Sequence, residues 1–245
     1  MPPGACAGGI AVVIDVLRAS TTIITALANG AGRIRPVRTI GEARGLAAGG
    51  GLLLGGEREG RPIVGFDLGN SPLEYSRHRI EGRDIVITTT NGTAAIHACK
   101  GSTDLLIGAV VNRSAVADRA VQESRSGHGR DVHLVCAGTG GAVTEEDRLG
   151  AGSILDAALR FGVAIEDLDN SARAALADYR GVVAAGPDAA TALACVFATS
   201  VGGRNLIAIG MEADLRPAAA IDSLWVVPRL DRPTGWLVAD QPRSG

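Results

Sequence analysis

Several short segments of the chain combine charged side chains, hydroxyls and glycines in patterns that suit anion chemistry. The first begins at Asp15, directly after the apolar run Ile10–Ile14, and adds Arg18, Ser20 and Thr21. The start of a helix offers free backbone amides, and the arginine fork grips phosphate or sulfonate. The segment therefore predicts an anion site with a carboxylate beside it, although a capped helix with a surface arginine would carry the same residues.

A second segment repeats this arrangement. Asn91, Gly92 and Thr93 follow a threonine-rich strand and open a helix. Glycine lets the backbone approach a ligand closely. We expect these three residues to bind the substrate, while an ordinary Asn-Gly turn is the alternative.

A third segment precedes the dipeptide Ser71-Pro72. Asn70 and Ser71 can cap a helix or bind a ligand, and the Asp67 carboxylate can meet a metal. The alternative is a loop with a local turn. Arg58, with Glu57 before it, is a further candidate for binding an anionic substrate, or is part of a solvated ion pair.

A fourth segment contains a glycine-rich turn, Cys136–Gly141, followed by Glu146 and Asp147. Acidic residues in the first turn of a helix are favoured by the helix dipole in any case. Their oxygens also suit Mg²⁺, which binds hard oxygen ligands. The carboxylates expected to hold Mg²⁺ are Asp15, Asp67, Glu146 and Asp147.

Other phosphate chemistries have signatures that this chain lacks. Lys100 stands in no P-loop frame. Cys136 is followed six residues later by Ala142, where a cysteine phosphatase needs arginine. No HxxxH or Cys/His cluster indicates zinc.

The elements that must position these residues alternate between strand and helix. Such alternation predicts an α/β fold with a mostly parallel sheet, helices on both faces and Rossmann-like layering. In such a sheet, ligands bind beyond the carboxyl ends of the strands. The expected strands are Ile10–Ile14, Ile34–Arg38, Leu52–Leu54, Asp84–Thr89, Asp104–Ala109 and Val132–Cys136. The expected helices are Thr21–Ala28, Gly41–Ala48, Thr93–Lys100, Ser114–Ser124 and Glu145–Phe161.

The C-terminal third is less regular. We expect helices between Glu166 and Ala198, short strands at Leu206–Ile209 and Leu224–Val227, and a loose tail after Pro228. Residues 1–245 form one domain, or two lobes of about 1–140 and 141–228 with a tail at 229–245.

Composition excludes several classes of protein. The chain has 245 residues, with 46% hydrophobic and 20% charged side chains, which is typical of a globular protein. A net charge of -2 and 3% aromatic residues argue against nucleic-acid binding. The longest apolar run is interrupted by Asp15 and Arg18, so we expect no membrane span.

The four cysteines stand far apart and form no CxxC pair, so we expect buried thiols in a reducing compartment, that is, the cytoplasm. Small cytoplasmic enzymes often pair, which favours a homodimer.

Four longer stretches resemble the 2-phosphosulfolactate phosphatase family, in the order in which that family has them. They read VVIDVLRASTTIITALANGA, GERxGxxxxGFDLGNSPLEY, TTTNGTAAI and CAGTxGxxxxEDxLGAGSI. The resemblance runs from about Ile10 to Pro228. It implies an α/β fold, Mg²⁺ dependence and hydrolysis of (2R)-phospho-3-sulfolactate to sulfolactate, a step of coenzyme M biosynthesis.

Carried over by position, the resemblance implies a set of site residues. They are Asp15, Arg18, Ser20, Thr21, Glu57, Arg58, Asp67, Asn70, Ser71, Asn91, Gly92, Thr93, Asn112, Glu146, Asp147 and Asp222. We expect Asp15, Arg18 and Glu146 to be catalytic, Asn112 to bind substrate and Arg58 to hold the sulfonate or carboxylate. Arg113 departs from the small residue expected after Asn112 and would recharge that edge.

Asp15 could orient the attacking water, attack the phosphorus itself or hold the metal, and the sequence leaves these open. Two other functions also stay open: a phosphatase for another small phosphorylated hydroxy acid, and a non-catalytic anion-binding module.

Overall fold

Short β-branched runs form the central strands. In the computed structural model, which describes residues 6–126 and 129–240, all five residues of Ile10–Ile14 are buried in a strand. Strands buried on both faces are typical of parallel sheets. The strands are β1 (Ile10–Ile14), β2 (Arg33–Pro36), β3 (Leu52–Arg58), β4 (Arg61–Pro62), β5 (Asp84–Thr88), β6 (Asp104–Gly108), β7 (Val132–Cys136), β8 (Val227–Asp231) and β9 (Trp236–Asp240).

Helices follow most of these strands. The helices are α1 (Ala19–Ala28), α2 (Ile40–Ala47), α3 (Arg77–Ile80), α4 (Gly92–Ala98), α5 (Arg113–Ser126), α6 (Glu145–Arg160), α7 (Asn170–Ala185), α8 (Ala189–Thr199), α9 (Val201–Ala208) and α10 (Leu215–Ala218). Short 3₁₀ turns are η1 (Pro72–Glu74), η2 (Val110–Asn112), η3 (Ile165–Asp167) and η4 (Glu212–Asp214).

The sheet consists of two parallel blocks joined by an antiparallel hairpin. Its order is β4-β3-β5-β2-β9-β8-β6-β1-β7. Strands β3, β5 and β2 run parallel, as do β6, β1 and β7, whereas β8 and β9 pair antiparallel with each other and with both blocks. The expected α/β fold is confirmed, and the expectation of a mostly parallel sheet is only partly correct.

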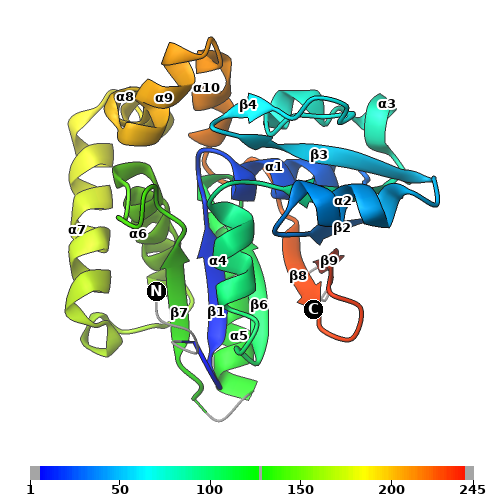
Figure 1. Cartoon of the computed structure of the whole chain (residues 1–245). Helices are drawn as coiled ribbons and strands as arrows, with labels where there is room; N and C mark the ends of the chain where they lie inside the picture. The colour runs from blue at the N-terminus through cyan, green and yellow to red at the C-terminus, as the bar shows by residue number, and fades with distance from the viewer. Residues whose placement is uncertain (1–5, 127–128, 241–245) are drawn as a thin grey trace.

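The sheet is strongly twisted and curls around helices α1 and α4. In Figure 1, β1 and β6 run up the view while β3 crosses it. One core cluster combines Val13 of β1, Ile23 of α1, Ile87 of β5, Ile96 of α4 and Leu237 of β9, so it contains both blocks. Helices α5 and α6 pack in a second cluster with the other side chains of β1. The curl therefore brings the two blocks to a shared interior.

The C-terminal region differs from the expectation. Leu206–Ile209, expected as a strand, lies in α9 and the turn after it, because Ser200 caps a helix by accepting a hydrogen bond from the Gly203 amide. The expected strand Leu224–Val227 begins only at its last residue. The expected loose tail forms β8 and β9 instead, as far as residue 240.

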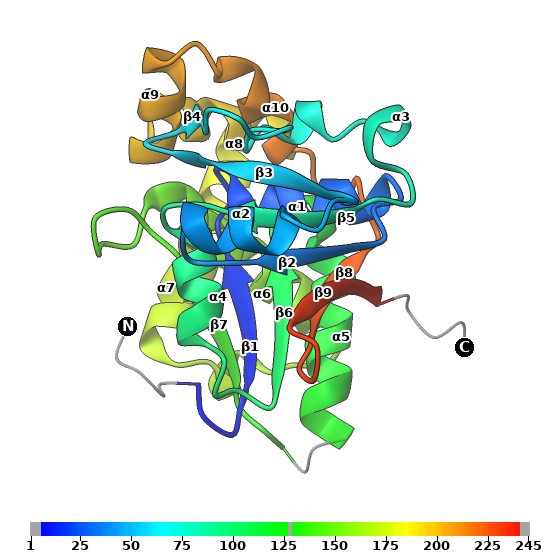
Figure 2. The same cartoon turned by 45° about the vertical axis from the view of Figure 1, so that its right-hand side comes forward.

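Helices α8, α9 and α10, with η4, form a group that we call the cap, residues 189–218. The cap lies above the upper ends of β1 and β6 in Figures 1 and 2. Because β1 and β6 are parallel, these are the ends at which an α/β site is expected.

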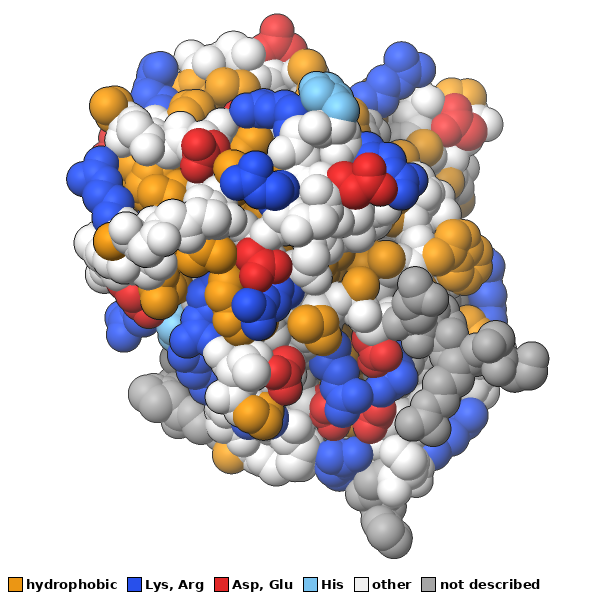
Figure 3. Space-filling model, turned by 90° about the vertical axis from the view of Figure 1, so that its right-hand side faces the viewer, with side chains coloured by type: hydrophobic (Ala, Val, Ile, Leu, Met, Phe, Trp, Pro, Cys, Tyr) orange, Lys and Arg blue, Asp and Glu red, His pale blue; other side chains and the backbone are white. Residues whose placement is uncertain are grey.

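A network of ion pairs attaches the hairpin to α5 and β6. Arg119 bonds both Glu123 at 2.7 Å and Asp240 at 2.9 Å, and Arg229 donates to Asp104 at 2.9 Å. Figure 3 shows acidic and basic side chains side by side on the lower half of this face. Networks of this kind stabilise more than isolated surface pairs do.

Two further expectations can be compared with the structure. Cys6 and Cys99 are buried as expected, but Cys136 is half-buried and Cys195 is exposed, because it lies on an outer position of α8. Within residues 6–126 and 129–240, no single helix is long and apolar enough to cross a membrane. The bent pair of α7 and α8 would reach that length and hydrophobicity together, by length and composition alone.

The position of the hairpin generates a test. Leu237 is fully buried in the core that contains both blocks, so Leu237→Ala should lower the free energy of unfolding by about 2–5 kcal/mol. Val238, its half-buried neighbour, provides the control Val238→Ala, which should cost less. Urea unfolding monitored by circular dichroism measures both. Equal, small effects would contradict a hairpin packed inside the sheet.

Candidate active site

Asp15 stands where β1 turns into α1. Its carboxylate Oδ1 accepts a hydrogen bond from the Ala19 amide at 3.2 Å, and its own amide donates to Ser20 Oγ at 2.9 Å. The carboxylate therefore satisfies the first backbone amide of α1, although the N-cap position itself is occupied by Arg18. It is 8% exposed, so its charge lies in a poorly solvated environment.

Gly92 lets α4 approach this carboxylate. A Cβ atom at Gly92 would lie 2.6 Å from Asp15 Oδ2 and 2.5 Å from the Ala19 methyl group. Only glycine permits this distance. The turn after β5 and the turn after β1 are thus in contact, although four strands separate β5 from β1 in the sheet. The structure brings the first and second predicted segments together.

Glu57 connects the end of β3 to the same region. Its Oε1 accepts from the Thr90 amide at 2.6 Å, and its Oε2 accepts from the Gly60 amide at 2.7 Å. Two backbone donors hold this buried carboxylate between the turns that follow β3 and β5. Glu57 therefore fixes the relative position of those two turns.

Glu146 and Asp147 enter from the first turn of α6. Asp147 accepts from the Val16 amide and the Gly138 amide, each at 2.8 Å, and so ties the turn after β1 to the turn after β7. Glu146 is 3% exposed, and its Oε2 has no hydrogen-bond partner among the described residues. A buried, unpartnered carboxylate oxygen is costly unless a ligand or cation meets it.

Burial and neighbouring carboxylates raise the pKa values of Asp15 and Asp147. Burial first, and then the charges of Glu57 and Glu146, raise the pKa of Asp15 to about 7. Burial and the charge of Asp15 raise the pKa of Asp147 well above its usual value. A cluster in this state can gain or release a proton near neutral pH, as acid–base catalysis requires.

Arg18 supplies a buried positive charge beside this cluster, as the sequence predicted. Its Nη1 donates to Asp214 Oδ2 at 2.7 Å and its Nη2 donates to the Gly60 carbonyl at 2.7 Å. The guanidinium is nearly completely buried, and its charge lowers the pKa of Asp15 as a minor effect beside burial. Arg18 is therefore inside the site, and two of its five guanidinium N–H groups are used in internal hydrogen bonds.

The predicted substrate-binding hydroxyls have a different role in the structure. Ser20 donates to the Val13 carbonyl, Thr21 to the Val16 carbonyl and Thr93 to the Thr89 carbonyl. Ser71 donates to Asp214 Oδ1 at 2.5 Å. A hydroxyl has one hydrogen to donate, so in this arrangement none of these four is left for a phosphate oxygen. They fix the turns that carry the charged groups.

Asn112 was expected to bind substrate, but the structure uses it to hold the backbone. It is fully buried, accepts from the Ala109 amide and donates to the carbonyls of Ile107 and Val226. Both of its amide hydrogens are thereby occupied. Its role is to join the end of β6 to the segment before β8.

Arg113 is likewise internal. It is paired with Asp222 at 3.0 Å, and its Nη1 donates to the Tyr179 hydroxyl at 2.6 Å. The sequence suggested that Arg113 adds a charge to the edge of the site, but its guanidinium is used in these internal contacts instead. Asp222 also accepts from the Ser114 amide and hydroxyl, so it caps α5.

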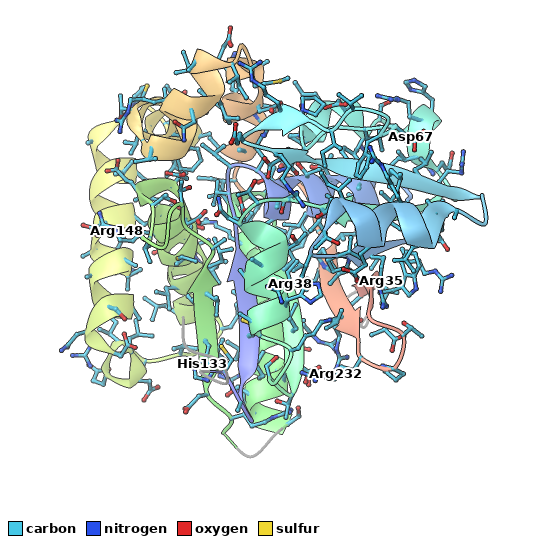
Figure 4. All side chains as sticks on the ribbon, viewed as in Figure 1. Arg35, Arg38, Asp67, His133, Arg148 and Arg232 are labelled. Atoms are coloured by element: carbon cyan, nitrogen blue, oxygen red, sulfur yellow. The ribbon has the colours of Figure 1, made fainter. Side chains whose placement is uncertain are left out.

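Asp67 is not gathered into the carboxylate cluster. Its carboxylate accepts from the Leu54 amide at 2.8 Å, three residues before Glu57 on β3, which corresponds to about 10 Å along a strand. Figure 4 places Asp67 near α3, away from the end of β1. Its side chain is exposed and closes a loop, so the structure does not support Asp67 as a metal ligand.

Three other predicted residues remain available to a ligand. Asn70 is buried, and its Oδ1 has no partner in the described part of the chain. Asn91 occupies the N-cap position of α4 without a side-chain cap bond. Arg58 donates to Thr88 Oγ1 at 2.9 Å at the end of β5, and lies next to Glu57.

Sequence reasoning missed two residues of the site. Asp214 binds both Arg18 and Ser71 from the cap, and it lies in no motif that the sequence singled out. Gly202 also escaped notice: a Cβ there would lie 2.1 Å from Glu146 Oε1. Only the path of the cap over the strand ends makes either residue relevant.

Three proteins of similar sequence share one activity name. A protein of Thermotoga petrophila, 39% identical over 220 residues that cover 90% of this chain and 88% of its own, is named probable 2-phosphosulfolactate phosphatase. Proteins of Symbiobacterium thermophilum (39% over 232 residues, 93% of each chain) and Deinococcus radiodurans (38% over 234 residues, 93% of this chain and 92% of its own) have the same name. Together with the site, this similarity defines the chain as a phosphoric monoester hydrolase.

The family follows from a match of nearly full length. The family described as 2-phosphosulpholactate phosphatase matches residues 2–233. The chain therefore belongs to the 2-phosphosulpholactate phosphatase family, as the resemblance of its motifs predicted. The matched region contains all the predicted site residues.

The raised pKa of Asp15 predicts how stability depends on pH. Burial raises this pKa from 3.8 to about 7, so between these pH values only the unfolded chain releases the proton. Stability should therefore fall as pH rises from about 4 to 7, by up to about 4 kcal/mol for this group. Asp15→Asn removes the titration and should be more stable than the wild type at pH 8, in the presence of EDTA.

Urea unfolding at pH 5 and pH 8 measures this effect, with the exposed Glu166→Gln as the control. If Asp15→Asn were less stable than the wild type at pH 8, the carboxylate would be stabilised as an anion by its surroundings.

Proposed function

We propose that this enzyme hydrolyses 2-phosphosulfolactate to sulfolactate and phosphate, with Mg²⁺ as cofactor. The observation that carries the proposal is the cluster of Asp15, Glu57, Glu146 and Asp147, buried at the strand ends of both blocks. The names of the relatives support the substrate. The proposed reaction would serve coenzyme M biosynthesis, and the cytoplasm and a homodimer stay predictions.

The donor set fits Mg²⁺ in one particular way. In the part of the chain that the structure describes, no three His, Cys, Asp or Glu side chains lie together as a ready metal site. Mg²⁺, however, usually keeps several waters and uses one or two carboxylates with the substrate phosphate. Asp15 and Glu146 are the residues that would hold it, because Glu146 Oε2 is buried without a partner.

The charges of the cluster are consistent with such a cation. When ionised, the carboxylates of Asp15, Glu57, Glu146 and Asp147 carry four negative charges, and Arg18 is already paired with Asp214. A bound Mg²⁺ would offset this excess, neutralise phosphate oxygens and favour ionisation of a water molecule.

Residues of the chain would bind the phosphate from two sides. Arg18 has five N–H groups, of which Asp214 and Gly60 accept one each, so three remain for phosphate oxygens. The amides of Asn91 and Gly92 make no hydrogen bond to any described residue and begin α4 close to Asp15. Backbone amides at a helix start bind phosphate well.

The second anionic group of the substrate needs a second cation. Arg58 lies at the ends of β3 and β5, one residue after Glu57, and is the candidate for the sulfonate or carboxylate. Asn70 Oδ1 is available to accept a hydrogen bond at the site, for example from water. Together these groups would orient the ester.

Asp15 is the proposed general base. Its carboxylate stands at the end of β1 beside the start of α4, where it could orient the attacking water and accept its proton. The alternative is that Asp15 attacks the phosphorus and forms an aspartyl phosphate. Acid quenching during turnover, borohydride reduction and mass analysis of the Asp15 peptide separate these routes: only an aspartyl phosphate is reduced to homoserine, whereas a free carboxylate is unchanged.

The central test is phosphate release from 2-phosphosulfolactate by the purified protein, with Mg²⁺ and with excess EDTA after dialysis. We expect turnover that requires the metal, and a panel of other phosphorylated hydroxy acids as slower substrates. Full turnover in EDTA would remove Mg²⁺ from the proposal. A faster reaction with another phosphate ester would show that 2-phosphosulfolactate is not the preferred substrate, while phosphate-ester hydrolysis would remain the reaction.

Cys136 offers a test of the nucleophile. Burial and the charge of Asp147 raise the pKa of this thiol to about 12, so the reactive thiolate is scarce at neutral pH. Cys136→Ser should therefore keep most of the turnover, measured as phosphate release at pH 7. Loss of turnover in a folded Cys136→Ser protein would make the thiol part of the chemistry.

A further inference from the structure

A buried ion pair connects the cap to the turn that carries Asp15. Arg18 and Asp214 approach to 2.7 Å, with side chains 3% and 2% exposed. The two residues are 196 positions apart in the chain, so the contact depends on the cap lying over the strand ends. Because a buried charge without its partner is costly, each residue constrains where the other can lie.

Both partners are held by additional hydrogen bonds. Arg18 Nη2 donates to the Gly60 carbonyl at 2.7 Å, and Asp214 Oδ1 accepts from Ser71 Oγ at 2.5 Å. Gly60 in turn donates to Glu57 Oε2 at 2.7 Å. The planar guanidinium is thus fixed by acceptors on two of its nitrogens, and Asp214 is fixed by a donor on its second oxygen.

We propose that Asp214 is a positioning residue of this enzyme, which orients the Arg18 guanidinium so that its remaining N–H groups bind the phosphoryl oxygens of the substrate. The inference rests on the proposed function, in which Arg18 binds phosphate. It makes the cap a part of the active site, because Asp214 belongs to η4.

The negative charge of Asp214 is essential to this role. Without it, the Arg18 guanidinium would be attracted to the carboxylates of the cluster, of which Asp15 already lies within range of its charge. Arg18 would then turn away from the phosphate. An asparagine at position 214 retains an oxygen that accepts a hydrogen bond but removes the charge, so Asp214→Asn isolates the electrostatic part.

The experiment compares Asp214→Asn with a matched control. Asp104 is also a buried aspartate paired with an arginine, Arg229, at 2.9 Å, but it begins β6 at the opposite end of the sheet. For each variant, with Mg²⁺ present, we would measure binding of inorganic phosphate by calorimetry, kcat and KM for the ester, and a melting curve. Arg18→Lys and the double variant Arg18→Lys with Asp214→Asn complete the set.

We expect Asp214→Asn to fold and to lose about tenfold or more in phosphate affinity and in kcat/KM, as for a hydrogen bond to a charged group. Asp104→Asn should leave both unchanged, whatever its melting temperature. The double variant should be no worse than Arg18→Lys alone, because Asp214 acts through Arg18.

Wild-type phosphate affinity and kcat/KM in folded Asp214→Asn would overturn the inference. So would losses in the double variant that equal the product of the two single losses, because independent effects multiply. Calorimetry needs no turnover. If the wild type binds phosphate but hydrolyses no ester, the proposed function fails. The coupling of Arg18 and Asp214 can then still be measured from the phosphate affinities of the variants.

Discussion

The antiparallel hairpin of β8 and β9 is the constraint on which the site depends. It joins two parallel blocks that share no direct strand pairing, β3-β5-β2 and β6-β1-β7. Because the joined sheet curls, the turn after β5 touches the turn after β1 at Gly92 and Asp15. In a flat sheet these strand ends would lie about 25 Å apart, five strand spacings away from each other. The carboxylate cluster exists only in the curled arrangement.

The same arrangement concentrates negative charge where water is excluded. Asp147 and Glu57 accept hydrogen bonds from backbone amides of different turns, and so hold together the segments that carry the other charged groups. Burial, together with the nearby charges of Glu57 and Glu146, raises the pKa of Asp15. Stability and reactivity therefore oppose each other here: the interactions that close the site also create a charge that is satisfied only by a proton or a cation.

The sequence predicted what depends on neighbouring residues and missed what depends on distant ones. β1 and β7 have the expected bounds, and in β1 a continuous apolar run does form a fully buried strand. The hairpin was missed because β8 includes Pro228 and the charged residues Arg229 and Asp231, which are not typical of a strand inside a sheet. Asp15, Arg18 and Glu146 come together as predicted. The hydroxyls predicted to bind substrate are instead bonded within the protein. Only the folded structure shows which acceptor each hydroxyl meets.

Chain order gives the hairpin a consequence for biosynthesis. Every other strand of the sheet, and the whole cap, precede β8 and β9 in the sequence. During translation both parallel blocks leave the ribosome before the element that unites them, so each must wait with an unpaired edge at β2 or β6. Open edges of this kind invite pairing with other chains. A nascent chain stalled before residue 227 should therefore need a chaperone. A chain that includes the hairpin can cover both edges by pairing β9 with β2 and β8 with β6.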